Sequence, residues 1–253
     1  SASSSTGLFV TVGDNGIILT SSDGTTWDNR TSGFSSILQD VTYGNGTFVT
    51  LGGTILTSCD GTTWTERTSG TSKNLYGIIY GNGLFVTVGG DGTILTSPDL
   101  TTWTERTSGT SHGFSGVAYG NSTFVAVGSG GTILTSTDGT TWTTRDSGIG
   151  GVHLYGVSYE NSIFVAVGKI GTVLTSTDGT SWTSRTSGTN GTFSKVIYGN
   201  SIFMAVSGGT VFTSSDGTTW TPRTSGTNGT LSEVIYKNNI FMAVSGRTVF
   251  TSP

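Results

Sequence analysis

Hydrophobic residues along this chain come in short runs separated by polar residues, and the runs recur at a regular interval. Within residues 114–148 the runs read FSGVAY, STFVAVG, GTILTS and TTWTTR, with Gly, Asn, Asp or Ser between them. Short runs rich in β-branched and aromatic residues, bounded by such turn residues, predict β-strands. The second run is apolar at nearly every position, so we expect a strand buried on both faces.

Six tryptophans mark the repeat, with spacings of 37, 39, 39, 40 and 38 residues. A unit of about 40 residues that holds four short strands is typical of a propeller blade. The sequence therefore predicts an all-β fold, a β-propeller with seven blades of four-stranded antiparallel sheets. We expect one domain over residues 1–253, built from repeats of about 39 residues.

The strand types are not equally frequent. The first strand, which ends in Tyr, and the fourth, which holds Trp, each occur six times, whereas the second and third occur seven times. We therefore expect incomplete first and last blades, with the chain opening at a second strand and stopping at a third. Because open strand edges promote aggregation, we expect self-association or a larger parent chain to complete these edge blades.

A turn of the form SxDGTTW, or a close variant of it, joins the third strand to the fourth six times; in SPDLTTW at 97–103, Leu100 replaces the Gly, so we expect that turn to differ locally. Its Asp can accept backbone N–H groups, its Gly can adopt a positive φ, and its Trp can bury a large ring between blades. The turns lie on six different blades and cannot converge on one site, so we interpret them as architecture. These structural residues are Asp23, Trp27, Asp60, Trp64, Asp99, Trp103, Asp138, Trp142, Asp178, Trp182, Asp216 and Trp220.

This turn resembles the Asp-box, or bacterial neuraminidase repeat, shortened by one residue between Asp and Trp. The resemblance covers essentially the whole chain and implies a β-propeller, as in sialidases, xyloglucanases, sortilin-type receptors and photosystem II assembly-factor-like proteins. Sialidase activity would imply three arginines that hold the substrate carboxylate. Six of the seven arginines follow a Trp by three residues and so belong to the repeat, and only Arg247 does not. We therefore expect a protein that is not an enzyme.

The composition of the chain argues against several classes of binding partner. The net charge of −4 and the 10% of charged residues argue against binding nucleic acid. No apolar run approaches the roughly 18 residues that span a bilayer, so we expect no membrane insertion. Cys59 is alone, which excludes an intrachain disulfide, and we expect no metal or cofactor. A surface rich in Ser, Thr and Gly and poor in charge favours a secreted or cell-surface protein.

Functional residues are expected where the repeats differ, because scaffold positions recur and a binding site need not. We expect the inter-blade loops and the loops between second and third strands to share one face, opposite the Asp turns. Charged residues at the start of the first strand should face the mouth of a central channel, where Lys195 and Glu233 could pair. The candidate binding residues are Asp40, Lys195, Glu233, Arg247, Lys169, Tyr76, Tyr155, His112 and His153.

These observations predict a non-catalytic binding or scaffold propeller that docks a protein or a glycan on the face of the inter-blade loops. A multivalent lectin that uses the two TSGTNGT loops is an alternative. A glycoside hydrolase, with Glu233 as the first carboxylate to test, and a self-assembling structural protein are further alternatives.

Overall fold

The computed structural model describes residues 2–4, 7–231, 233–237, 239–245 and 248–252. The chain divides into two compact units. The first comprises Ser1–Phe114 with Asp138–Trp142, and the second comprises Ser115–Thr137 with Thr143–Pro253. The prediction of one domain over the whole chain stays a prediction.

The first unit contains three antiparallel sheets of four consecutive strands, blades 1 to 3. Blade 1 consists of β1 (Ala2–Ser4), β2 (Phe9–Val12), β3 (Ile18–Ser21) and β4 (Asp28–Arg30). Blade 2 consists of β5 (Leu38–Gly44), β6 (Thr47–Gly52), β7 (Ile55–Ser58) and β8 (Thr65–Arg67). Blade 3 consists of β9 (Leu75–Gly81), β10 (Leu84–Gly89), β11 (Ile94–Ser97) and β12 (Thr104–Glu105).

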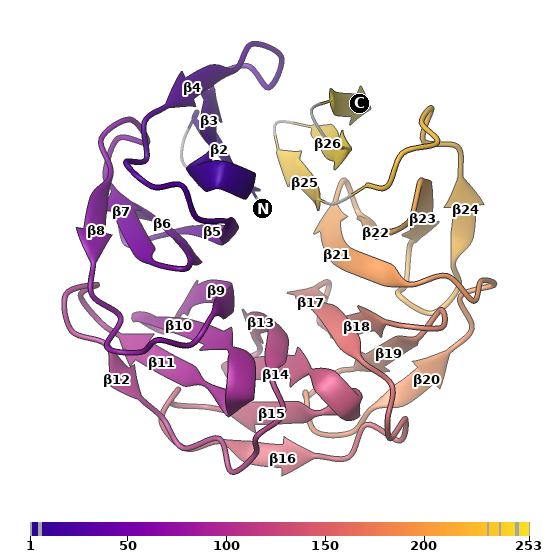
Figure 1. Ribbon diagram of the computed structural model, residues 1–253. Coiled ribbons are helices and arrows are strands. Elements are labelled where there is room, and N and C mark those ends of the chain that lie inside the picture. Colours follow the sequence, from indigo (N-terminus) through magenta and orange to yellow (C-terminus); the bar gives the residue numbers. More distant parts are fainter. Residues whose placement is uncertain (1, 5–6, 232, 238, 246–247, 253) are drawn as a thin grey trace. The chain divides into compact units, whose positions relative to one another are not determined.

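The second unit holds blades 4 to 7 (Figure 1). Blade 4 consists of β13 (Phe114–Gly120), β14 (Thr123–Gly128), β15 (Ile133–Ser136) and β16 (Thr143–Arg145). Blade 5 consists of β17 (Leu154–Glu160), β18 (Ile163–Gly168), β19 (Val173–Ser176) and β20 (Thr183–Arg185). Blade 6 consists of β21 (Phe193–Gly199), β22 (Ile202–Ser207), β23 (Thr210–Ser214) and β24 (Thr221–Arg223). Blade 7 consists of β25 (Glu233–Lys237), β26 (Ile240–Ser245) and β27 (Thr248–Ser252).

The seven sheets confirm the predicted fold class, an all-β propeller with seven blades. Helical geometry in the described residues is confined to three 3-10 turns, η1 (Asp14–Gly16), η2 (Gly90–Gly92) and η3 (Ser129–Gly131). None of these is long and apolar enough to cross a membrane.

The prediction of an incomplete first blade is wrong. Strand β1 pairs with β2 in antiparallel register, with Ala2 opposite Thr11 and Ser4 opposite Phe9, and gives blade 1 a fourth strand. The segment has no alternation of apolar residues that would reveal it in the sequence; backbone pairing with the apolar strand β2 defines it. Within the described residues, blade 7 has three strands, as predicted.

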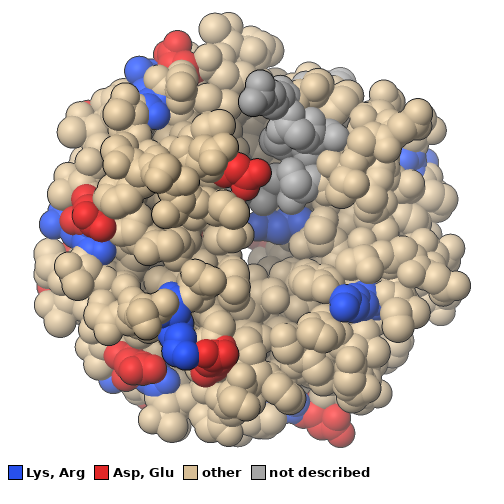
Figure 2. Space-filling model, viewed as in Figure 1, with Lys and Arg blue, Asp and Glu red and all other residues tan. Residues whose placement is uncertain are grey.

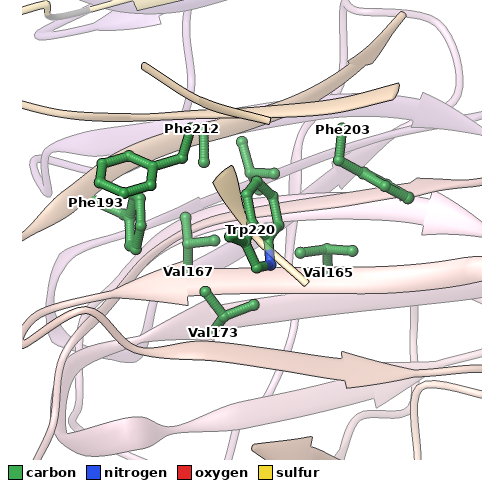
Figure 3. Close-up of a cluster of buried hydrophobic side chains, with 9 residues drawn as sticks. Val165, Val167, Val173, Phe193, Phe203, Phe212 and Trp220 are labelled. Atoms are coloured by element: carbon green, nitrogen blue, oxygen red, sulfur yellow. The ribbon is translucent and has the colours of Figure 1, made fainter. Parts of the chain in front are cut away.

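The core lies along the second and third strands of each blade. In β14 the burial runs unbroken from Phe124 to Gly128, and β15 is buried throughout. Figure 3 shows such a cluster between blades 5 and 6, where Trp220 lies among Val165, Val167 and Phe203. Apolar side chains from both faces of a strand are thus removed from water, which explains why the second-strand pattern is nearly continuous rather than alternating.

The Tyr-Gly-Asn hairpin uses its residues in a way that positive φ alone does not explain. Asn45 and Asn121 take the positive φ, at 47° and 46°, whereas Gly120 lies in extended backbone. A Cβ on Gly120 would lie 2.6 Å from the Cβ of Tyr159 in the next blade, and closer still to two atoms of that ring. The glycine is therefore required by the close approach of a neighbouring tyrosine.

Candidate functional site

The two sets of loops share one face in each unit, as the sequence predicts, and we call it the loop face. In the first unit, a Cβ on Gly92 in η2 would strike the carbonyl oxygen of Thr110 in the loop that leaves blade 3. In the second unit, a Cβ on Gly171 would strike the carbonyl oxygen of Thr189 in the same way. These two inter-blade loops thus rest on the turn between the second and third strands of the preceding blade, and glycine makes that approach possible.

The inter-blade loops bond to their own next blade as well. The Gly90 N–H donates to the carbonyl of Asn74 at 2.9 Å, and the Lys169 N–H donates to the carbonyl of His153 at 2.9 Å. The same pairing in blades 3 and 5 places the residues around Asn74 and His153 at equivalent positions beside a turn. These two places, the blade 3 rim and the blade 5 rim, carry four of the nine predicted binding residues, namely Tyr76, His153, Tyr155 and Lys169.

Polar groups of the loops are largely bonded within the loops. In the TSG segments, the serine hydroxyl accepts the N–H of the residue two positions later in the chain. The same hydroxyl donates to the carbonyl of that later residue. For Ser187 and Thr189 these distances are 3.3 and 3.2 Å, and for Ser225 and Thr227 they are 3.3 and 3.1 Å. The Thr189 hydroxyl also accepts the Gly191 N–H at 3.0 Å. Local bonding of this kind fixes the loop conformation and engages polar groups that a ligand would otherwise use.

Exposed hydrophobic side chains gather on the loop face. Within the described ranges, the large hydrophobic residues classed as exposed are Ile17, Ile37 and Tyr76 in the first unit and Ile170 in the second, with exposed fractions of 43%, 49%, 37% and 66%. Each lies in an inter-blade loop, in a turn between second and third strands, or at the start of a first strand. The Gly13 carbonyl accepts the Leu38 N–H, and the Gly13 N–H donates to the Ile17 carbonyl. Because Ile37 precedes Leu38 in the chain, Ile17 and Ile37 lie near each other.

The blade 3 rim combines an exposed ring with an ion pair. Tyr76 is in the second position of β9, and Asn74 precedes that strand. The Lys73 ammonium donates to the Asp91 carboxylate in η2, and this bond raises the pKa of Lys73. Because both side chains are exposed, the pair defines the position of two charges without adding much stability.

The blade 5 rim places two aromatic side chains beside an exposed aliphatic one. The rings of His153 and Tyr155 stack with their centres 6.4 Å apart and their planes 22° apart. Lys169 and Ile170 follow in the adjoining turn, where Ile170 has a φ of 55°. A β-branched residue rarely adopts that conformation, so the turn holds Ile170 outward at an energetic cost.

The other predicted binding residues lie elsewhere. Asp40 follows a bulge in β5, and its carboxylate accepts the Ile78 N–H of β9 at 2.9 Å, which links the first strands of blades 2 and 3. Lys195 lies in β21, opposite Val206 of β22 and close to Gly156 of the preceding blade. Glu233 begins β25, while the place of its side chain and all of Arg247 lie outside the described residues.

His112 is exposed in the loop after blade 3, where its N–H donates to the Thr110 hydroxyl at 3.0 Å. The exposed isoleucines and Asp91 were not among the predicted binding residues. A signal for Ile170 exists in the sequence, because an isoleucine inside the glycine-bounded turn GKIG has no strand partner to cover it.

The Asp turns have the geometry of structural turns. In the first, Asp23 Oδ1 accepts the N–H groups of Thr25 and Thr26 at 2.8 Å each, and Ser21 Oγ accepts the Gly24 N–H at 2.8 Å. These bonds, with that of Thr26 the largest cause, hold the pKa of the Asp23 carboxyl well below its usual range. The turns around Asp60, Asp99, Asp178 and Asp216 repeat both the bonds and the lowered pKa.

The arginines that follow each Trp bond to their own sheet. The Arg185 Nε donates to the Thr175 hydroxyl at 2.8 Å, and the equivalent bonds recur in blades 1 to 4 and 6. Across the described part of the chain, no three His, Cys, Asp or Glu side chains form a group that could hold a metal ion. In the view of Figure 2 most of the surface is uncharged, and acidic and basic side chains are mixed rather than gathered by sign.

Comparisons with known proteins agree on the fold. No family model matches the chain, and no curated protein matches it. Among solved structures, YCF48 bound to a D1 peptide has 17% identity and a TM-score of 0.78 over 99% of this chain and 89% of that one. YCF48 from Cyanidioschyzon merolae has 16% identity and a TM-score of 0.73 over 97% and 90%.

A catalytically inactive variant of virginiamycin B lyase from Staphylococcus aureus, solved with quinupristin, has 12% identity and a TM-score of 0.82 over 96% of this chain and 92% of that one. A binding protein and a lyase thus share this architecture. The fold alone therefore does not determine the function.

Proposed function

We propose that this chain is a non-catalytic binding or scaffold module that docks a protein segment on its loop face. One observation carries the proposal: in each unit, the large hydrophobic side chains exposed among the described residues lie on the loop face of that unit. Isolated exposed hydrophobic residues are ordinary, but three of them on the loop face of the first unit are typical of an interaction surface.

The two rims supply the polar part of such a surface. Tyr76 and Tyr155 each offer an apolar ring and a hydroxyl, a combination that is enriched at protein interfaces. Lys73 and Asp91 beside Tyr76, and Lys169 beside Tyr155, add charges that could orient a bound segment. This division of roles supports an apolar anchor with a polar rim.

The loops favour a protein over a glycan as the partner. A glycan is bound mainly by hydrogen bonds, whereas the serine and threonine groups of the TSG loops already bond to their own backbone. The similar fold of YCF48 occurs with a bound D1 peptide, which is consistent with this preference. Carbohydrate binding is the alternative, and a glycan array distinguishes it from protein binding.

The repeat arginines also fit a non-catalytic module. The repeat arginines donate to strand hydroxyls, so they support the blades and are not directed to a shared site.

We also propose that the protein works outside the cell or at its surface, because its composition is rich in Ser, Thr and Gly and poor in charge. Secretion would be tested by locating the tagged chain in its native host.

Peptide phage display on the purified chain tests the proposal. Selected peptides should bind with a dissociation constant in the micromolar range and at least tenfold more weakly to a variant that combines Ile37→Asp, Tyr76→Asp and Ile170→Asp. Thr144→Asp, on an exposed outer strand, is the matched control and should leave binding unchanged.

Equal binding to the wild type and the loop-face variant would contradict the proposal. A glycan array on the same samples separates the alternative, since a saturable sugar signal that Tyr155→Ala abolishes would establish a lectin instead. A circular dichroism spectrum of each variant ensures that a loss of binding is not a loss of folding.

A further inference from the structure

Three hydrophobic side chains lie on the loop face of the first unit where blade 1 meets blade 2, and we call them the blade 1–2 patch. They are Ile17, which follows η1, and Phe34 and Ile37, which lie in the loop between β4 and β5. Ile17 and Ile37 are 43% and 49% exposed, and Phe34 is partly buried. The patch therefore presents apolar surface to solvent.

Backbone contacts with η1 hold the patch together. The Gly13 carbonyl accepts the N–H of Leu38, the residue next in the chain after the patch, at 3.0 Å. The Gly13 N–H donates to the Ile17 carbonyl, also at 3.0 Å. On the other side of the turn, a Cβ on Gly16 would strike the carbonyl oxygen of Phe34. The turn and the loop thus keep the three side chains in one place.

The hydrophobic character of the patch is a departure from the repeat. In the loop that enters blade 3, the residues that correspond to Phe34 and Ile37 are the polar Thr71 and Asn74. The residues that correspond to Ile17 are threonine in all the other blades, namely Thr54, Thr93, Thr132, Thr172, Thr210 and Thr248. Because the other blades form with polar residues at this position, the fold does not require isoleucine there.

The neighbouring turn of blade 2 leaves Ile37 uncovered. Between the second and third strands, blade 2 has only residues 53–54, whereas blade 3 has residues 90–93. A Cβ on Gly53 would lie 3.3 Å from the Cβ of Ser36, directly before Ile37. A short turn with glycine at this point provides little cover, in agreement with the exposure of the isoleucine.

The charged residues around the patch are acidic. In residues 13–17 and 31–40, the charged residues are Asp14 and Asp40. Asp14 is in η1, directly before the patch residue Ile17 in that turn, and it is exposed. Asp40 is partly buried in β5, and its carboxylate accepts an N–H from β9 at 2.9 Å. The exposed Asp14 therefore places a negative charge beside the apolar surface.

Basic side chains of the adjoining segments have acidic partners of their own. Arg30, at the end of β4, donates to the Asp28 carboxylate at 2.9 Å. Lys73, in the next inter-blade loop, pairs with Asp91 in η2. These pairs compensate their own charges, so the patch keeps its acidic surroundings.

We infer that the blade 1–2 patch binds a protein segment in which large hydrophobic side chains lie beside Lys or Arg. The hydrophobic side chains of the segment cover Ile17 and Ile37, and its basic group approaches Asp14. An acidic segment of equal hydrophobicity is disfavoured by repulsion, so charge selects among hydrophobic partners. This inference rests on the proposed function, because it names the place on the loop face and the chemistry of the docked segment.

Three labelled peptides of equal length provide the test by fluorescence anisotropy with the full chain. The peptide GSLKFRLSG combines hydrophobic and basic residues and should bind with a dissociation constant below about 1 mM. The acidic peptide GSLEFELSG and the polar peptide GSSKSRSSG should each bind at least about tenfold more weakly, because each lacks one of the two contacts.

A variant with residues of the repeat locates the apolar part of the site. It combines Ile17→Thr, Phe34→Thr and Ile37→Asn, which other blades carry at these positions, so it should fold like the wild type. Binding of GSLKFRLSG should be at least about tenfold weaker. A circular dichroism spectrum of the variant confirms its fold.

A charge reversal locates the acidic part. Asp14→Lys introduces the residue that blade 5 has at this position, Lys169. It should weaken binding of GSLKFRLSG at least about fivefold and strengthen binding of GSLEFELSG by a similar factor. The matched control is Ser129→Lys, at the same position of the turn in blade 4, which should change neither affinity by more than about twofold.

Three outcomes would overturn the inference. The first is the absence of saturable binding of GSLKFRLSG up to about 1 mM, and the second is equal affinity for the basic and acidic peptides. The third is a dimer of the chain, seen by sedimentation, that the variant with repeat residues dissociates, since a second copy would then cover the patch.

The peptides selected by phage display separate this inference from the proposed function. If they lose affinity for Tyr76→Asp or Ile170→Asp but bind the variant with repeat residues as well as the wild type, docking on the loop face stands and this inference fails. If they bind every loop-face variant as tightly as the wild type, the proposed function itself fails.

Discussion

The contact between Gly120 and the next blade provides a quantitative test of the packing. Gly120 ends the first strand of blade 4 in extended backbone, where alanine is equally allowed. Without a neighbour, Gly120→Ala should stabilise the protein by about 0.4–1 kcal/mol, because the unfolded chain loses freedom. The Tyr159 ring of blade 5 lies where the new methyl group would stand. We therefore expect the substitution to destabilise the protein.

The size of the effect follows from how far the tyrosine can yield. Overpacking a core typically costs about 1–3 kcal/mol, which exceeds the gain from alanine. Glu160 stands in blade 5 where Gly120 stands in blade 4. In the blade after Glu160, the ring planes of Tyr198 and Phe203 are 61° apart and their centres 4.8 Å apart. In the blade after Gly120, those of Tyr159 and Phe164 are 51° and 4.4 Å apart. The scaffold thus accommodates a Cβ by turning the ring.

A net loss of about 1–2 kcal/mol follows from these opposing terms, equivalent to a fall of about 2–8 °C in Tm for a protein of this size. Differential scanning calorimetry would measure it. Gly13→Ala is the control, because Gly13 is extended with open space around its Cβ position, so this substitution should raise Tm by about 1–4 °C.

The decisive measurement is a double-mutant cycle with Tyr159→Ala. If the clash is the cause, Gly120→Ala should cost nothing, or stabilise slightly, once the ring is absent. A Gly120→Ala protein as stable as the wild type would refute the reasoning. An equal loss in both backgrounds would refute it as well, since it would place the cause in the backbone.

Three further predictions concern the turns. Trp220→Ala should lower the free energy of unfolding by about 3–5 kcal/mol in urea, and Trp220→Phe by clearly less; equal losses would contradict a role for ring packing. Leu100→Gly relieves a φ of 64° but removes a buried side chain, so a net loss of about 1–3 kcal/mol is expected in the same assay, and a gain would show that strain dominates. The folded state lowers the pKa of Asp178, so the stabilisation it gives is present above pH 4 and lost as the pH falls; the deficit of Asp178→Asn in Tm should be largest at pH 7 and shrink toward pH 2.

The fold is predictable because each blade repeats its local signals. The Trp period, the apolar second strand and the SxDG turn agree with one another, so no long-range information is needed to define the blades. Strand β1 escapes this reasoning, since Ala2–Ser4 has no pattern of its own and is defined only by its partner β2. The need for glycine in the Tyr-Gly-Asn hairpin likewise escapes a reading of one blade, because Tyr159 belongs to another blade.

The candidate site is less predictable because it depends on exposure. Variation between repeats singles out Tyr76, Tyr155 and Lys169, which do lie on the loop face. The same criterion selects Asp40, whose carboxylate instead bonds to the Ile78 amide of the next blade. Only the packing shows that Ile37 stays uncovered, since isoleucine is usually a core residue.

The matching backbone bonds of the two rims have a consequence for how such a surface can change through evolution. Because Asn74 and His153 bond to the adjoining turn through their main chains, the side chains around them can be exchanged without loss of those bonds. Duplication of a blade would copy a ready support, and point substitutions could then diversify what it displays. Transplanting the residues His153 and Tyr155 onto another blade should therefore move a recognition feature around the protein as an interchangeable part.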